Sequence, residues 1–376
     1  MDIEGQDQDR LERDLGVIGS SPISRSDAER YWTEHRDHLN GKIGSALELI
    51  GGSSIEMAVL GAGNCNDFDL GAFVEDPRLS SISLIDLDRR GVEEALMLAF
   101  EMVRGRLTRT LGGETGAVLS PEAERELVSK CRLIHGDVTF FMESFIKRID
   151  GLDIGKKSRY RSLNTPARRS DFLRPILDII KECIDAAVVP ENLAGKYQFV
   201  VSDCILSQIL VSIEVRIAAY LRRKLLEPPG TDLRGGALEN SQALWKMIKT
   251  EVPRLLIPHH IEILKALTVS EGLIFIASDQ VRLRRAKVPL EVATEQKVPP
   301  ESLIQIPEQG FVMVQGPERR VHLQDGNLRK IIETSFPGIT ILEESRWVWN
   351  RQPFQLQPAG QFFEAEEVHG VMMRNI

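Results

Sequence analysis

The sequence predicts an α/β protein with a Rossmann-like fold, a three-layer sandwich around a seven-stranded, mostly parallel sheet. Short apolar runs that predict buried strands alternate along the chain with longer segments of helical periodicity. Such alternation is typical of parallel sheets with helices on both faces. The last two predicted strands, at 338–349 and 368–373, have no long helix between them. We expect them to form an antiparallel hairpin at the end of the sheet.

Length and composition bound the class of protein. The chain has 376 residues, a formal net charge of −8 and 42% apolar residues, which is ordinary for a globular protein. The acidic balance argues against a nucleic-acid partner, because phosphate neutralisation favours a basic surface. No apolar run reaches the roughly 20 residues that span a bilayer, and no apolar secretory segment opens the chain. We expect a cytoplasmic protein without a membrane partner, and the oligomeric state stays open.

The cysteines point to the same compartment. None of the four forms a C-x-x-C pair, so reduced thiols are expected and a zinc site is not. They are Cys65, Cys131, Cys183 and Cys204.

Composition along the chain divides it into two parts. Residues 1–23 are expected to be a disordered lead-in, and 24–376 one domain that opens with a helix over 24–50. A helical insertion is predicted at about 150–195, and its start, 150–170, is expected to be a loop or mobile lid. The proline-containing residues 284–320 are expected to be irregular.

Glycines or acids stand where each of the first four predicted strands ends. They are Gly61-Ala62-Gly63-Asn64, then Asp86-Leu87, then Asp137-Val138, and last Asp203. Glycines between a strand and a helix allow a tight turn and the close approach of a ligand. An acid roughly 20 residues later can accept hydrogen bonds from ribose hydroxyls. Since the carboxyl ends of parallel strands meet at one edge, a nucleotide-like ligand is expected there.

This arrangement resembles the class I S-adenosylmethionine-dependent methyltransferases over about residues 30–376. Val59-Leu60-Gly61-Ala62-Gly63 matches the start of the family's V-L-G-x-G-x-G-like loop, and the terminal hairpin also fits the family. Asn66 departs from the third glycine of the dinucleotide fingerprint, and Asn64 and Cys65 make the loop unusual.

The resemblance implies S-adenosylmethionine as cofactor and assigns each motif a part of it. The loop of Gly61, Ala62, Gly63 and Asn64 would contact the methionine part. Asp86, with Leu87 beside it, would bind the ribose, and Asp137 with Val138 would frame the adenine. Asp203 would lie near the methionine amine and the substrate.

The same resemblance implies methyl transfer, and the residues favour a small-molecule substrate. Ser202-Asp203-Cys204 lacks the Asn/Asp-Pro-Pro-aromatic signature of methylation on nucleobase or amide nitrogens. Asp203 is the best candidate for a proton acceptor or substrate anchor, and His135 is a weaker one. Tyr31 and Trp32 could wall the substrate site, although core or surface packing is the favoured interpretation.

For several other features a structural role or a solvent-exposed surface is the favoured interpretation. His35 and His38 are helical neighbours that could ligate a metal, but no third ligand is apparent, so a solvated helix face and no metal are expected. Packing roles are favoured for His259, His260 and the strand 346–349. The basic stretch 156–169 is expected to be a solvated insertion, with an anionic substrate or RNA as the alternative.

Three alternatives to methyl transfer stay open. An aminopropyl or aminocarboxypropyl transferase shares the fold but needs extra acids around the fourth strand, and only Asp203 is evident there. A nicotinamide-dependent oxidoreductase is disfavoured by Asn66. A non-catalytic scaffold that kept the fold is disfavoured by the intact Gly61, Gly63 and Asp86.

Overall fold

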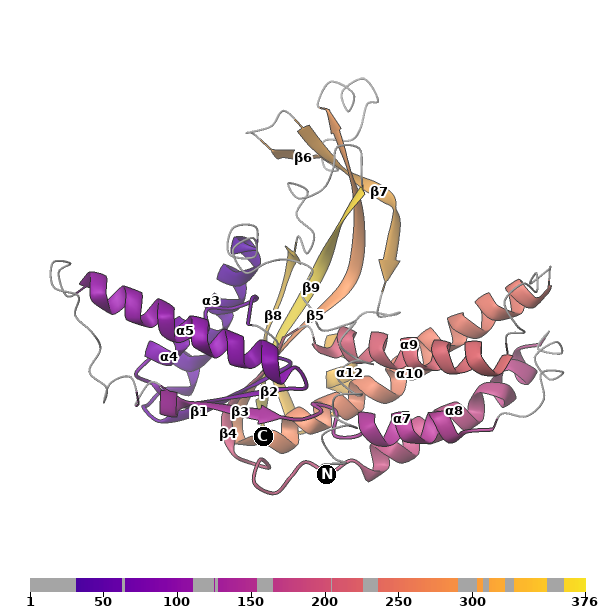
Figure 1. Cartoon of the computed structure of the whole chain (residues 1–376), viewed down its shortest axis with the longest axis horizontal. Helices are drawn as coiled ribbons and strands as arrows, with labels where there is room; N and C mark the ends of the chain where they lie inside the picture. Colours follow the sequence, from indigo (N-terminus) through magenta and orange to yellow (C-terminus); the bar gives the residue numbers. More distant parts are fainter. Residues whose placement is uncertain are drawn as a thin grey trace.

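A computed structural model defines the fold (Figure 1). It describes residues 32–62, 65–110, 125, 128–153, 165–203, 205–225, 236–289, 303–306, 311–321, 328–349 and 362–376. The expected lead-in and the first turns of the opening helix lie outside these residues, as do Tyr31, Gly63, Asn64 and Cys204.

Helices and strands alternate over the first two thirds of the chain, as predicted. The helices are α3 (Thr33–Ile50), α4 (Leu70–Glu75), α5 (Arg89–Thr110), α7 (Met142–Gly151), α8 (Pro166–Ala186), α9 (Ile205–Leu225), α10 (Gly236–Leu267) and α12 (Leu328–Ser335). The strands are β1 (Ile55–Leu60), β2 (Leu79–Asp86), β3 (Cys131–His135), β4 (Tyr197–Asp203), β5 (Thr268–Pro289), β6 (Leu303–Ile306), β7 (Phe311–Val321), β8 (Ile339–Trp349) and β9 (Phe362–Asn375).

The sheet has the predicted parallel core and reversed terminal hairpin. Strands β3, β2, β1, β4 and β5 lie side by side in that order and pair in parallel. Strand β9 pairs antiparallel with β5, and β8 pairs antiparallel with β9. The expectation of a seven-stranded, mostly parallel sheet with a terminal antiparallel hairpin is therefore confirmed.

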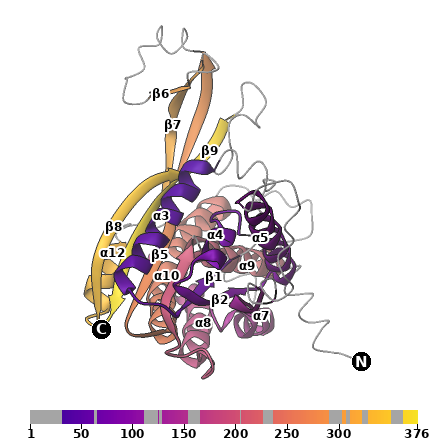
Figure 2. The same ribbon diagram turned by 90° about the vertical axis from the view of Figure 1, so that its left-hand side faces the viewer.

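The sheet continues beyond these strands in a way the sequence did not predict. Strand β5 has 22 residues, and its second half pairs with β7, which in turn pairs with β6. Together with residues 362–367 of β9, these segments project from the body as an arm (Figures 1 and 2). The expectation that 284–320 is irregular is wrong for 284–289, 303–306 and 311–320. The charged run Arg282–Arg285 and the nearby prolines hide the strand pattern there.

Two hydrophobic layers cover the sheet, one on each face. Along β1 the side chains of Ala58 and Leu60 join the layer under α7, α8, α9, α10 and α12. Met57 and Val59 join the opposite layer, under α3, α4 and α5. This alternation follows from the two-residue period of a strand, and it explains why the strand is apolar at nearly every position.

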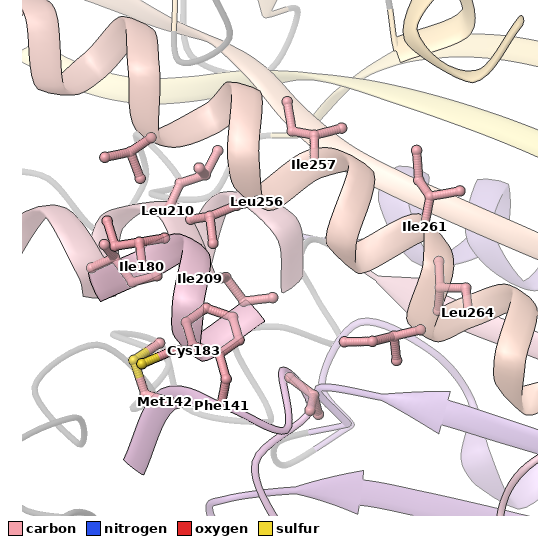
Figure 3. Close-up of a cluster of buried hydrophobic side chains, with 14 of the residues drawn as sticks. Phe141, Met142, Ile180, Cys183, Ile209, Leu210, Leu256, Ile257, Ile261 and Leu264 are labelled. Atoms are coloured by element: carbon pink, nitrogen blue, oxygen red, sulfur yellow. The ribbon is translucent and has the colours of Figure 1, made fainter. Parts of the chain in front are cut away.

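The helices of the first layer pack closely against one another (Figure 3). Leu256, Ile257, Ile261 and Leu264 of α10 and Ile209 and Leu210 of α9 belong to the same buried cluster as Phe141 and Met142. Fully burying one such aliphatic side chain stabilises the fold by about 1.5–3 kcal/mol. The layer therefore fixes α7 and α8 against α9 and α10.

The loop expected at 150–170 is shorter than predicted. Residues 150 and 151 belong to α7, and Pro166 already opens α8. The Thr165 side chain accepts a hydrogen bond from the Arg168 backbone N–H and so caps that helix. The basic residues around Thr165 and Pro166, with glycine, serine and asparagine between them, predict a loop and hide this helix start. Residues 154–164 lie outside the described residues.

No helix in the described part of the chain is both long and apolar enough to cross a bilayer.

Gly370 gives a test of the terminal hairpin. A Cβ there would lie 2.8 Å from Trp347 Cζ3, 3.0 Å from Ser345 Oγ and 3.2 Å from Phe275 Cε2. Gly370→Ala should therefore lower the free energy of unfolding by about 1–3 kcal/mol in a urea titration, as overpacking does.

A second glycine provides the matched control. A Cβ at Gly41, inside α3, would have no other atom within 4 Å. Gly41→Ala should raise stability by roughly 0.5–1 kcal/mol, because alanine is the better helix former. Equal effects of the two substitutions would contradict this packing of β9.

Candidate active site

The carboxyl ends of four parallel strands lie at one edge of the sheet. Leu60 at the end of β1 is in register with Ile85 of β2 and Ser202 of β4. Asp86, the last residue of β2, is in register with His135, the last residue of β3. The structure thus brings together the four motifs that the sequence places at strand ends. Their roles in ligand binding remain predictions.

The loop after β1 turns at a glycine. Gly61 has a φ of +70°, a region that favours glycine, and its N–H donates to the Ile85 carbonyl at 2.9 Å. Ala62 then closes a second turn, in which its carbonyl accepts from the Cys65 N–H at 2.8 Å. The following helix, α4, begins at Leu70. Asp69 caps it by accepting from the Ala72 N–H at 3.1 Å.

Asp86 is held by the turn that follows β2. Its Oδ1 accepts from the Asp88 N–H at 2.7 Å, and Asp88 Oδ1 in turn accepts from the Gly91 N–H at 2.9 Å. Asp88 therefore caps α5, while Asp86 stands half-buried at the strand end. The acid predicted to bind a ribose is in the predicted place. Beside it, the Leu87 carbonyl lies 2.9 Å from His135 Nε2, so that ring nitrogen is the protonated donor.

Asp137 has a structural task that the sequence did not reveal. Its carboxylate accepts from the Thr139 N–H at 2.8 Å, from the Thr139 hydroxyl and from the Met142 N–H at the start of α7. Burial raises the pKa of Asp137, and these hydrogen bonds partly offset that rise. Asp137 lies five residues before the first residue of α7, outside the N-cap position where an acid signals a helix start in a sequence. Whether Asp137 and the buried Val138 also frame an adenine stays a prediction.

His35 does not lie on a solvated helix face, and that expectation is wrong. Its side chain is 1% exposed. The imidazole stacks on Trp349 with ring centroids 4.4 Å apart, and the Trp347 indole N–H donates to His35 Nδ1 at 2.8 Å. Helix α3 packs against β8, so its histidine face meets tryptophans that point to the same side of the strand.

The rest of this aromatic cluster comes from the same two elements. His38 stacks on Trp347 at 4.3 Å, and Trp32 meets Trp349 edge-on at 4.9 Å. Trp32 is 3% exposed, so packing against Trp349 accounts for its position. The idea that Trp32 walls a substrate stays a prediction.

His35 has two acidic neighbours that could serve with it as metal ligands, and His38 is not part of this group. A ring nitrogen of His35 and carboxylate oxygens of Asp67 and Asp203 all lie within 4.8 Å of one another. We call this group the His35–Asp67–Asp203 trio. Asp203 is 5% exposed at the end of β4, and Asp67 is half-buried in the loop after β1. The signal that sequence reasoning missed is an acid directly after the glycine loop, 32 positions from His35.

The Trp347 contact decides how this trio can act. An indole N–H only donates, so His35 Nδ1 must accept, and the neutral ring carries its proton on Nε2. A histidine that ligates a metal ordinarily donates from its other nitrogen. The observed contact therefore favours a hydrogen-bonding His35 over a metal ligand.

His259 and His260 take packing positions, as predicted. His260 is buried, and its Nε2 lies 2.8 Å from Ser202 Oγ. His259 Nε2 donates to the Thr139 carbonyl at 3.0 Å, and its ring meets Phe141 edge-on. Burial lowers the pKa of both His35 and His260 to about 3. Repulsion from His38 and Arg36 adds to the pKa shift of His35, and repulsion from His259 adds to that of His260.

The described cysteines are free thiols. They are Cys65, Cys131 and Cys183. Burial raises the pKa of Cys131 to about 12, so that thiol stays protonated.

The comparison with known proteins found similar solved structures, but no match in sequence. No family model matches the chain, and no curated protein matches it in sequence. Three solved structures illustrate the neighbours. They are magnesium protoporphyrin IX methyltransferase from Synechocystis PCC 6803 (TM-score 0.35, 10% identity, 98% of this chain and 94% of that chain), a putative methyltransferase from Bacillus halodurans C-125 (0.34, 8%, 89% and 98%) and the N-methyltransferase NodS from Bradyrhizobium japonicum WM9 (0.32, 11%, 91% and 97%).

These TM-scores are low, and the fold assignment rests on the strand order and directions given above. The chain has a Rossmann-like fold. Its parallel core with an antiparallel last strand is the arrangement that the resemblance to class I methyltransferases implies.

The buried histidines predict a specific acid sensitivity. Unfolding returns His260 from a pKa of about 3 toward 6.5, so the unfolded chain binds an extra proton between those pH values. Stability is thus full above pH 6.5 and falls as the pH drops toward 3, by up to about 1.4 kcal/mol per pH unit for each such histidine. His260→Gln should reduce this slope by about that amount in urea titrations across the pH range.

The same titrations contain their own control. Above pH 7 neither the folded nor the unfolded chain gains a proton at this site. The plots of unfolding free energy against pH for the parent chain and for His260→Gln should therefore run parallel there. An unaltered slope between pH 4 and 6 in the variant would mean that His260 is not buried in its neutral form.

Proposed function

We propose that this chain is a class I S-adenosylmethionine-dependent methyltransferase that acts on a small molecule. The observation that carries the proposal is the edge where the Gly61 turn, Asp86 and Asp203 meet. This edge belongs to a parallel sheet whose last strand is reversed, as the resemblance implies. Open α/β sheets bind their ligands at such carboxyl edges.

The residues at this edge fit the chemistry of the cofactor. Asp86 offers a half-buried carboxylate, the acceptor that ribose hydroxyls require. The turn at Gly61 lets the backbone run close to a ligand, and the loop formed by Gly61, Ala62, Gly63 and Asn64 would hold the methionine part. Asp203 would lie near the amine of that part, and Asp137 with Val138 near the adenine. Bound there, S-adenosylmethionine supplies a methyl group already activated on sulfur.

The protein's own contribution is alignment and the exclusion of water. Methyl transfer is an in-line displacement, so most of the rate gain comes from holding nucleophile and methyl carbon in line. Helices α7 and α8 follow β3, and α9 and α10 follow β4, all packed into one layer. Such a layer beside the site can shield a small substrate from bulk water. Asp203 is the proposed anchor or proton acceptor.

Charge supports the choice of a small substrate. The net charge of −8 provides no long-range attraction for a polyanion, and Ser202-Asp203-Cys204 lacks the prolines that shape a nucleobase or amide slot. Free buried thiols at Cys65 and Cys183 fit a reducing compartment, so we also propose a cytoplasmic location.

Calorimetry tests the cofactor assignment. S-adenosylhomocysteine should bind in the micromolar range, and Asp86→Ala should weaken it by about 1–3 kcal/mol, the usual effect of losing a buried hydrogen-bond partner. NAD, titrated in parallel, should not bind. Asp76→Ala serves as the matched control, because Asp76 pairs with Arg78 at 2.6 Å before the amino end of β2. An Asp86→Ala chain that binds as tightly as the parent would remove the ribose assignment.

Labelled methyl transfer tests the substrate class. The chain, given S-adenosylmethionine with a labelled methyl group and a cell extract, should label the small-molecule fraction after separation by size. Asp203→Asn should abolish that labelling, because it removes the anchor or proton acceptor. Label confined to RNA, DNA or protein would overturn the small-molecule assignment.

A further inference from the structure

The His35–Asp67–Asp203 trio gathers three polar groups from distant parts of the chain. His35 comes from α3, Asp67 from the loop after β1, and Asp203 from the end of β4. His35 and Asp203 are buried, whereas Asp67 is half-buried. It also adjoins the edge of the sheet where the methyl donor is proposed to bind.

The ring of His35 is fixed in place before any ligand arrives. Trp349 stacks on its face with an interplanar angle of 13°, and Trp347 holds Nδ1 at 2.8 Å. Among the described residues, Nε2 of His35 is buried and has no hydrogen-bond partner. The trio thus combines one N–H donor, on Nε2 of His35, with two carboxylates whose oxygens lie within 4.8 Å of a ring nitrogen of His35. Preorganised donors of this kind need no rearrangement when charge develops near them.

This donor and acceptor pattern selects among possible ligands. A hydroxyl group can accept from the His35 N–H and donate to a carboxylate at the same time. An ammonium can pair with a carboxylate, as proposed for the methionine amine beside Asp203, but it has no acceptor for the His35 N–H. A divalent cation needs a lone pair on Nε2, which the Trp347 contact leaves protonated.

We propose that the trio binds a hydroxyl group of the methyl acceptor, which makes the chain an O-methyltransferase. This inference rests on the proposed function and names the substrate class for it. His35 donates to the hydroxyl oxygen, and Asp203 accepts its proton. Asp67 completes the acceptor side of the trio.

The proton and electron pairs balance in one displacement. The O–H bond breaks as its proton passes to a carboxylate oxygen of Asp203. A lone pair of the oxygen forms the bond to the methyl carbon. The bond between that carbon and sulfur breaks, and its electron pair stays on sulfur. The His35 N–H stabilises the negative charge that gathers on oxygen as the proton leaves.

The tautomer of His35 can be measured without a substrate. Nitrogen-15 spectra of the histidine-labelled full chain should show His35 protonated on Nε2, and Trp347→Phe should abolish this strict preference. Titration with Mn²⁺ alone should leave the His35 signals unchanged. An Nδ1-protonated ring in the parent chain, or stoichiometric Mn²⁺ binding that Asp203→Asn abolishes, would overturn the proposal.

Product analysis tests the substrate class itself. In the labelled small-molecule fraction the methyl group should be attached to oxygen, and a methyl group on nitrogen, carbon or sulfur would contradict the proposal. His35→Leu should reduce labelling about 100-fold, as removal of an oxyanion donor does. His35→Gln keeps an N–H near the position of Nε2 and so restores that donor. Its labelling should be only about tenfold below that of the parent chain.

Two controls separate the possible failures. His369→Gln changes an equally buried histidine, which contacts Glu344 at 2.9 Å on the terminal hairpin, and should leave labelling unchanged. Calorimetry with S-adenosylhomocysteine on the His35 variants reports folding and cofactor binding. If the parent chain does not bind it, the proposed function fails. If binding persists but His35→Gln is as inactive as His35→Leu, the proposed role of His35 is wrong.

Discussion

The parallel pairing of β1 with β2 and β4 is the constraint on which the rest of the structure depends. In this register Met57 and Val59 face one hydrophobic layer, and Ala58 and Leu60 face the other. A slip by one residue would exchange the two sets and expose both layers to misfit side chains. The same register aligns the strand ends, so the packing that stabilises the sheet also places the Gly61 turn beside Asp86 and Asp203. The site is thus a consequence of core packing, and it needs no separate scaffold.

The reversed hairpin of β8 and β9 links the two ends of the chain at this site. Trp347 of β8 donates to His35 of α3 across 312 positions of sequence. The close approach of Gly370 to the Trp347 ring shows how tightly β9 packs behind that contact. The hairpin therefore does more than close the sheet, because it orients an imidazole and fixes which of its nitrogens carries the proton. Substitutions in β9 that move Trp347 should thus affect the site without touching it.

Much of the fold could be predicted from the sequence, because the periodicities of strands and helices are local features. The same holds for Asp86, Asp137 and Asp203, whose positions follow from where each strand ends. The residues that surround His35 could not be predicted, because spacing on a helix defines a face but does not say which residues cover that face. Asp67 was missed for the same reason, since only the fold brings its loop to α3. The arm of β5 and β7 was missed because charged residues and prolines interrupt the apolar pattern of the sequence there.

Burial also suggests how the two carboxylates of the trio divide their work. Asp203 is almost fully buried at the end of β4, so it can take a proton from a substrate hydroxyl out of reach of bulk water. Asp67 is half-buried in the loop after β1, so it keeps some contact with solvent. It would then oppose the positive charge of the methyl donor, while Asp203 handles the proton. On this division, Asp67→Asn should weaken binding of S-adenosylmethionine more than binding of the uncharged-sulfur product, whereas Asp203→Asn should impair transfer at saturating donor.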